Sequence, residues 1–414
     1  MHKISFPCSH PSLSLFRHQY TILPLIHLTY THHSDIACGV LYKYDDTTAN
    51  VTQLLKCSGI IGPEGKDANY GIPSDMTRRS EGGSNGLYWS SDGNDILYMN
   101  QHGWKRIVQL NVNDINEEES TIDPTLVTVV ADTYNSSLLN SPNDMVEGKD
   151  GYLYFTDPPF GLQYKDVDDP FAYSFQMMTQ DKPAVYRTKR INQNPVLVET
   201  ERLLEFEVAE EPSERFGPNG IALTENGELA VAITDWNNPR THIYSPGENS
   251  TFNPEPTAVL LHEYRIEGKN AAYPPLTDGI TYDPDRRVLF ISGPGGIYIY
   301  EAFDEYDLLG FLRIDDLVSN NVVGGGYLWI TANQRLLRVP LAEVVGTETD
   351  TSSSTVEVEE DISSTAVEEK EVEEEVIDEG GDDETKAGDT SAGHNSSLSP
   401  LFLSYSMLIL LWLR

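Results

Sequence analysis

Short runs of alternating apolar and polar residues, separated by tight turns, recur along residues 34–345. The clearest run is Leu139–Gln163, which reads LNSPNDMVEGKDGYLYFTDPPFGLQ. Polar residues open it, a Lys-Asp-Gly turn divides two alternating stretches, and Asp-Pro-Pro ends the second one. Alternation with a period of two on both sides of a glycine turn predicts a β-hairpin with a polar cluster where its first strand begins.

The same hairpin pattern occurs five times. The copies begin at Asn85, Asn143, Asn219, Asp278 and Asn321, at intervals of 58, 76, 59 and 43 residues. Each interval leaves room for two more strands, and four-stranded units at this period are typical of a β-propeller. Counting strands in Ser34–Cys57 as a first unit, we predict an all-β, six-bladed propeller over residues 34–345.

The Asn or Asp that begins each copy has two interpretations. An Asn-Gly or Asp-Gly pair is often an ordinary turn, because glycine and asparagine accept a positive φ. Here, however, the residue precedes the first strand of its unit. The first strand of a blade lines the central channel, so these side chains are expected to converge on the axis. An oxygen-rich cage of this kind suits hard cations.

The flanking segments differ in composition. Residues 1–33 contain no Asp or Glu, and we interpret them as a leader or a mis-assigned N-terminus. Residues 346–397 hold 18 Asp and Glu against two Lys, which predicts a disordered acidic stalk. Residues 398–414 are mostly apolar and follow small residues and a polar spacer, an order typical of a GPI-anchor signal; a membrane helix is the competing interpretation.

The charge and the sequons bear on partners and location. The formal net charge is −37, and no basic stripe exists to neutralise phosphates, so we expect no nucleic-acid partner. Sequons at Asn50, Asn135, Asn249 and Asn395 favour passage through the secretory pathway. We therefore expect a monomeric glycoprotein, extracellular or at the cell surface, that meets the membrane only through a C-terminal lipid anchor.

The stretch Leu139–Gln163 resembles the gluconolactonase branch of the regucalcin (senescence marker protein)/gluconolactonase family, through its PND…FTDPP block. Phe216–Ala222 (FGPNGIA) and Leu276–Ile280 (LTDGI) resemble later motifs of that family, and the likeness covers about residues 34–344. The resemblance implies a six-bladed propeller with one divalent cation, most often Ca²⁺ and sometimes Zn²⁺, that hydrolyses small sugar lactones.

The resemblance also implies roles for particular residues. Asn219 and Asp278 match two metal ligands of the family, and Asn143 matches a residue that contacts the substrate. Asp278 would also act on the attacking water, as the catalytic residue. His102 is a candidate substrate contact at the rim, with a hydrogen-bonded structural histidine as the alternative.

One ligand of the family is missing. Its third protein ligand is a Glu in an EGPVW motif, which would fall near residues 17–20, and no Glu occurs before Glu64. Either the metal has been lost and the protein is a non-catalytic surface propeller that binds glycans or proteins, or the N-terminus is not the natural one. We favour the second explanation, because the loss coincides with the change in composition at Ser34.

Other hydrolase classes fit less well. The chain contains no HExxH motif, which argues against a zinc protease of that type. The related propellers of paraoxonases and strictosidine synthases remain an alternative, although the PND…FTDPP block matches them less closely.

Overall fold

The computed structural model describes a large part of the first 344 residues. The chain separates into two units, Met1–Asp361 and Ile362–Arg414, and all described residues belong to the first. The described residues are 4–5, 22–24, 30–35, 39–45, 48–60, 83–91, 95–162, 164–165, 173–174, 178–189, 199–208, 216–235, 237–248, 251–262, 276–303, 305–314, 316–333 and 335–344.

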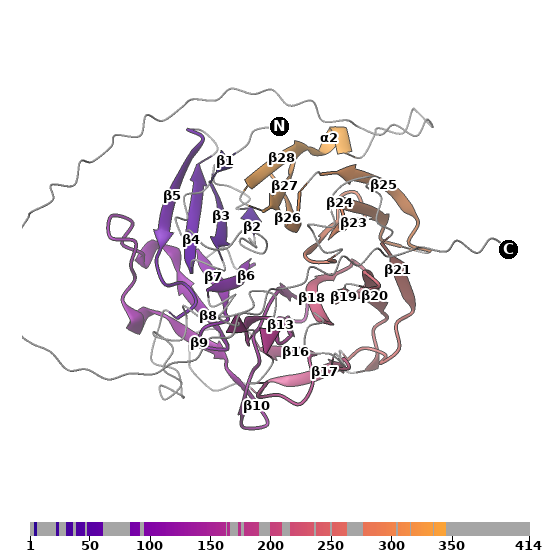
Figure 1. The fold of residues 1–414 in the computed structure, drawn as a ribbon, viewed down its shortest axis with the longest axis horizontal. Coiled ribbons are helices and arrows are strands. Elements are labelled where there is room, and N and C mark those ends of the chain that lie inside the picture. Colours follow the sequence, from indigo (N-terminus) through magenta and orange to yellow (C-terminus); the bar gives the residue numbers. More distant parts are fainter. Residues whose placement is uncertain are drawn as a thin grey trace, which may run out of the picture. The chain divides into compact units, whose positions relative to one another are not determined.

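Within these residues the strands pair into six four-stranded antiparallel sheets (Figure 1). Five of the sheets take their strands in chain order. The first two are β2 (Ile22–Pro24), β3 (Tyr30–Asp35), β4 (Val40–Asp45), β5 (Asn50–Leu55), and β6 (Ser84–Trp89), β7 (Ile96–Gln101), β8 (Arg106–Asn111), β9 (Thr128–Ala131). The next three are β12 (Met145–Glu147), β13 (Tyr152–Asp157), β16 (Ala184–Lys189), β17 (Glu201–Glu205), then β18 (Phe216–Leu223), β19 (Leu229–Asp235), β20 (Arg240–Tyr244), β21 (Ala258–Leu261), and β22 (Ile280–Asp283), β23 (Val288–Gly293), β24 (Gly296–Glu301), β25 (Leu308–Arg313).

The remaining four-stranded sheet is composite. It combines β26 (Val318–Gly324), β27 (Tyr327–Ala332) and β28 (Arg335–Pro340) with β1 (Ile4–Ser5), which pairs antiparallel with β28. The predicted all-β propeller is therefore confirmed. The expectation of six blades is corrected. Five blades are each built from one stretch of chain, whereas this remaining sheet draws its strands from both ends of the described chain.

Short elements connect the blades. Two small hairpins and four short helices lie among the described residues: β10 (Thr133–Tyr134) with β11 (Ser137–Leu138), β14 (Tyr164–Lys165) with β15 (Tyr173–Ser174), the 3₁₀ helices η2 (Val112–Asp114), η3 (Pro124–Leu126) and η4 (Phe160–Leu162), and α2 (Leu341–Val344). No helix in this described part is long and apolar enough to cross a membrane.

Three predicted segments stay untested. Most of residues 1–33 and all of 346–397 and 398–414 lie outside the described residues, so the leader, stalk and anchor remain predictions. Strands β1 and β2 do fall within residues 1–33, and β3 begins inside this segment.

The core lies between neighbouring blades. Each blade has two apolar faces, and the buried clusters contain residues from adjacent sheets. Ile233 of β19 packs in one cluster with Val185 of β16, and Leu289 of β23 packs in another with Ala232 of β19. Face-to-face packing of this kind fixes the angle between blades and thereby the position of each inner strand.

The hairpin that opened the sequence analysis is confirmed. Strands β12 and β13 pair antiparallel, with Met145 opposite Phe155, and the turn contains Gly151 at φ +79°. Figure 1 shows β6, β18 and β26 toward the middle of the ring, as expected for the first strand of a blade.

Candidate functional site

The glycine after the first residue of a repeat lets two blades approach closely. Gly86, Gly220 and Gly279 do not have a positive φ, so these Asn-Gly and Asp-Gly pairs are not turns. Their N–H groups instead donate across to the next blade, as Gly86 N to Asn143 O (2.6 Å), Gly220 N to Asp278 O (3.2 Å) and Gly279 N to Ser319 O (2.9 Å). A Cβ at Gly220 would lie 2.3 Å from Asp278 O, so a side chain is excluded by backbone atoms.

The inner strands carry irregularities at the same places. The register of β6 on β7 shifts between Ser84 and Leu87, and that of β18 on β19 shifts between Pro218 and Ile221. A bulge turns side chains that the regular pleat would direct elsewhere, and bulges are common beside active sites. Asn219 lies within the second bulge.

A hydrogen-bond network connects the predicted site residues. Asn143 N donates to Thr156 O (2.8 Å), and Thr156 Oγ1 donates to Asn219 O (2.6 Å). Asn219 Nδ2 then donates to Thr234 Oγ1 (2.9 Å), which itself donates to the carbonyl of the residue before Asp278 (2.8 Å). Asn143, Asn219 and Asp278, from three consecutive blades, are thus brought into one buried cluster.

A second arm of the cluster contains His102. Asn85 Nδ2 donates to Asn143 Oδ1 (2.7 Å) and lies 3.3 Å from His102 Nε2. Because an amide nitrogen only donates, Nε2 is the acceptor in this contact. His102 is fully buried, and a Cβ at Gly161 would lie 2.6 Å from the ring. His102 therefore reaches Asn143 through Asn85, a contact that supports orientation of the amide.

Two buried carboxyl groups flank Asn143. Burial raises the pKa of Asp144 to about 7, against N–H groups of Met145 and Ile221 that lower it. Burial likewise raises the pKa of Asp157 to about 7. Asp157 accepts from Asn140 N (2.9 Å) and Ser141 N (2.8 Å), so it holds the segment that leads into Asn143.

Sequence reasoning missed several of these residues. Asn85 begins a repeat but has no role predicted from the sequence, and neither have Thr156, Thr234 and Asp157. A signal was present in the sequence, because the second strands of two blades, β13 and β19, both end in Thr-Asp. Their hydroxyls bridge blades, which alternation alone does not reveal.

The last repeat was misplaced by two residues. The carbonyl that accepts from Gly279 belongs to Ser319, so Ser319 corresponds to Asn143 and Asp278. Asn321, predicted as the first residue of that copy, uses Nδ2 to bond Gly279 O, Phe290 O and Ser292 Oγ between blades. The reason is that Ser319 offers a weaker sequence signal than the Asn-Asn pair after it.

Ser84 occupies a GxSxG string, Gly82 to Gly86, which in other folds marks a nucleophilic serine. Here Ser84 lies in β6 with no exposed surface, and its Oγ donates to Ser58 Oγ (2.6 Å). This string therefore does not form the strand–helix turn that exposes a nucleophilic serine.

The donor set suits a hard cation in part. Asn219 gives its amide hydrogen to Thr234 Oγ1, which leaves Oδ1 as a possible ligand atom, and Asp278 supplies a carboxylate on the next blade. Within the described residues no group of three or more His, Cys, Asp or Glu could hold a metal. A site here would use amide and carboxylate oxygens together, as Ca²⁺ does.

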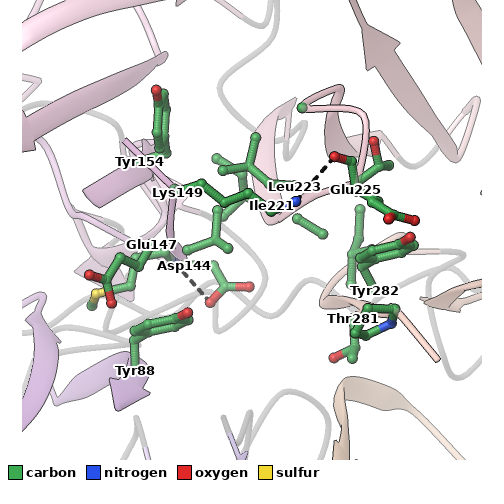
Figure 2. A pocket seen from close by; sticks show the side chains of 18 of the residues that line it. Tyr88, Asp144, Glu147, Lys149, Tyr154, Ile221, Leu223, Glu225, Thr281 and Tyr282 are labelled. Carbon is green, nitrogen blue, oxygen red and sulfur yellow. Dashed lines mark hydrogen bonds between the residues drawn. The ribbon is translucent and has the colours of Figure 1, made fainter. Parts of the chain in front are cut away.

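A cavity of about 710 Å³ lies farther along the same inner strands. Its lining starts at Asp144, Ile221 and Ile280, one or two residues beyond the predicted site residues, and continues to the turns at Lys149 and Glu225. Figure 2 shows Asp144 at this cavity, with Lys149 Nζ donating to Glu225 O (3.4 Å). The cavity thus begins beside the predicted site and extends from there toward the hairpin turns.

The chain was compared with known proteins. No protein-family model matches it. A gluconolactonase of Zymomonas mobilis subsp. mobilis is 31% identical over 314 residues, which cover 74% of this chain and 73% of the relative.

Solved structures share the fold. A gluconolactonase of Xanthomonas campestris superposes with a TM-score of 0.53 at 17% identity, over 79% of this chain and 87% of that one. A luciferin-regenerating enzyme superposes with a TM-score of 0.50 at 12% identity, over 77% and 85%. At these identities the likeness establishes the propeller and nothing further.

Proposed function

Since the chain belongs to the regucalcin/gluconolactonase family and is thereby a lactonase, a hydrolase of ester bonds, we propose that it opens a sugar lactone at the cluster of Asn143, Asn219 and Asp278 with the help of a divalent cation. The observation that carries this proposal is the network through Thr156 and Thr234, which connects these three residues across consecutive blades.

The chain's own residues have distinct tasks in the proposed reaction. Asn143, oriented by Asn85 and behind it His102, binds the lactone oxygens. Asp278 orients the attacking water and accepts its proton, which a carboxylate within hydrogen-bond reach of the water can do. The ring oxygen leaves as the alcohol of the opened hydroxy acid and takes up the proton that Asp278 accepted from the water.

Asn219 and Asp278 would hold the cation, most often Ca²⁺ in this family. When bound, the ion supplies Lewis acidity to the lactone carbonyl and makes a bound water more acidic. The first-blade Glu that would complete the ligand set is absent from residues 1–63.

The proposal includes the architecture and location. The composite sheet serves as a sixth blade, which β1 closes by pairing with β28. The protein passes through the secretory pathway and is held at the cell surface by a lipid on its C-terminal region. In support, the sequon residues Asn50 and Asn135 are both exposed. Release from intact cells by a phosphatidylinositol-specific phospholipase tests the anchor, and retention of all protein on the cells would contradict it.

The activity test uses glucono-1,5-lactone, a pH indicator to follow acid release, and chelated protein with Ca²⁺ or Zn²⁺ added back. Asp278→Ala should abolish metal-dependent hydrolysis. Asp285→Ala, an exposed residue of the same blade, is the matched control and should retain it. Undiminished metal-dependent activity in Asp278→Ala would refute the assignment. Absence of metal-dependent activity in the wild type would favour the non-catalytic binding propeller.

A further inference from the structure

The cavity at the far end of the inner strands is a second place where a small molecule fits. Its volume of about 710 Å³ lies within the range usual for ligand pockets, roughly 300–1,000 Å³. None of the three residues of the predicted lactone site, Asn143, Asn219 and Asp278, lines it. A ligand here is therefore distinct from the lactone.

The charge of the lining is negative. Asp144, Glu147, Asp150 and Glu225 contribute carboxyl groups, and among the described residues that line the cavity Lys149 is the single Lys or Arg. The ammonium of Lys149 already donates to Glu225 O at the turn end of the cavity. Aldonic acids, the anionic products of lactone hydrolysis, would be repelled from this surface, so the cavity does not suit them.

The walls are apolar and aromatic. Ile221, Leu223 and Val322 line the cavity together with Tyr88 and Tyr282. In Figure 2 the side chain of Tyr88 lies on one side of the Asp144 carboxylate, and Thr281 and Tyr282 lie on the other. Tyrosine faces attract cations, and apolar walls favour a ligand with a hydrocarbon body over a hydrated metal ion.

The inner end carries the strongest polar feature. Asp144 is 8% exposed, and its Oδ1 accepts from Met145 N (2.9 Å). This bond holds the carboxylate at the cavity. Among the described lining residues the only basic side chain is Lys149, which lies at the turn end. A ligand cation at this end would supply the missing counter-charge.

From these observations we infer that the cavity binds an organic cation, an ammonium group with an aromatic or branched apolar body. The ammonium lies against Asp144, and the body lies between Tyr88 and Tyr282. This binding does not use Asn143, Asn219 or Asp278, none of which lines the cavity, so it does not rest on the proposed lactonase activity.

The experiment measures binding of three probes to the full chain by calorimetry. Phenethylammonium and benzyltrimethylammonium are the cations, and 2-phenylethanol is the neutral analogue. We expect both cations to bind and the alcohol to bind at least tenfold more weakly, since the charge pair is lost. Equal binding of the alcohol, or no binding of either cation, would overturn the inference.

Variants locate the site. Asp144→Asn should weaken cation binding at least tenfold, and Leu223→Trp should weaken it by filling the cavity. Glu118→Gln, an exposed residue that does not line the cavity, is the matched control and should stay within about twofold. Circular dichroism confirms that each variant is folded. Unchanged affinity in both Asp144→Asn and Leu223→Trp would refute the location. Phenethylammonium should leave the KM for glucono-1,5-lactone unchanged, and competition between the two would place it at the lactone site instead.

Discussion

Replacing Gly220 with alanine tests whether close contact between two inner strands holds the site together. The new Cβ would lie 2.3 Å from Asp278 O, 2.7 Å from Gly279 Cα and 2.8 Å from Ile280 N. All three are backbone atoms, so no side chain can rotate away. An ordinary carbon–oxygen contact is longer than this by about 1 Å, and β18 and β22 must separate by that amount.

The separation has an energetic and a functional cost. Overpacking costs about 1–3 kcal/mol, and the bond from Gly220 N to Asp278 O contributes about 1 kcal/mol more. We therefore expect Gly220→Ala to lower the free energy of unfolding by about 3 kcal/mol. Because Asn219 and Asp278 move apart, we also expect about a 100-fold loss of lactone hydrolysis, the usual effect of a 1 Å displacement.

The assay combines urea unfolding, followed by circular dichroism, with acid release from glucono-1,5-lactone. Gly310→Ala is the matched control, because its Cβ would meet only Ile299 Cδ1, at 3.8 Å, and Gly310 does not have a positive φ. That variant should be as stable as the wild type or slightly more so. If Gly220→Ala matched Gly310→Ala in both stability and activity, the argument for close contact at the site would be wrong.

Three further predictions concern the network and its charges. Thr156→Val removes the donor to Asn219 O and the acceptor of Asp144 N, and urea unfolding should show a free energy of unfolding lower by about 3 kcal/mol. The control Thr188→Val should be neutral, because Thr188 Oγ1 is buried and has no hydrogen-bond partner among the described residues. Burial raises the pKa of Asp144 from 3.8 to about 7, so the folded state holds the proton more tightly than the unfolded state. Relative to Asp144→Asn, the wild type should therefore lose stability as pH rises from about 4 to 7, by about 4 kcal/mol at most. Equal pH dependence of the two proteins would contradict this. Chelation should abolish lactone hydrolysis while leaving the circular dichroism spectrum of the propeller unchanged, and addition of Ca²⁺ or Zn²⁺ should restore the activity; activity that survives chelation would argue against the cation.

The sequence predicted the blades because alternation is a property of each strand by itself. Leu139–Gln163 shows a clean period of two, and the hairpin β12–β13 forms where expected. The composite sheet could not be predicted in this way. Pairing of β1 with β28 joins residues more than 300 positions apart, and two strand residues at Ile4–Ser5 carry no detectable pattern.

The candidate site was predictable in its side chains but not in its connections. Asn143, Asn219 and Asp278 each begin a repeat, and the resemblance to the family implied their roles. Their positions relative to one another depend on hydroxyl groups of Thr156 and Thr234, which bond to backbone carbonyls of the next blade. Such bonds leave no spacing rule within a single strand, and they emerge only when blades pack.

The composite sheet also has a consequence for solubility. In the described residues, β1 pairs with β28 only at Leu336 and Arg335, so most of the outer edge of β28 is an open row of peptide groups. An open edge invites pairing with a second chain. Charged residues and proline are the means by which proteins resist such pairing, and β28 carries Arg338 and ends at Pro340. Arg338 and Pro340 thus lie on the part of β28 that β1 does not pair with, where they disfavour pairing with a second chain.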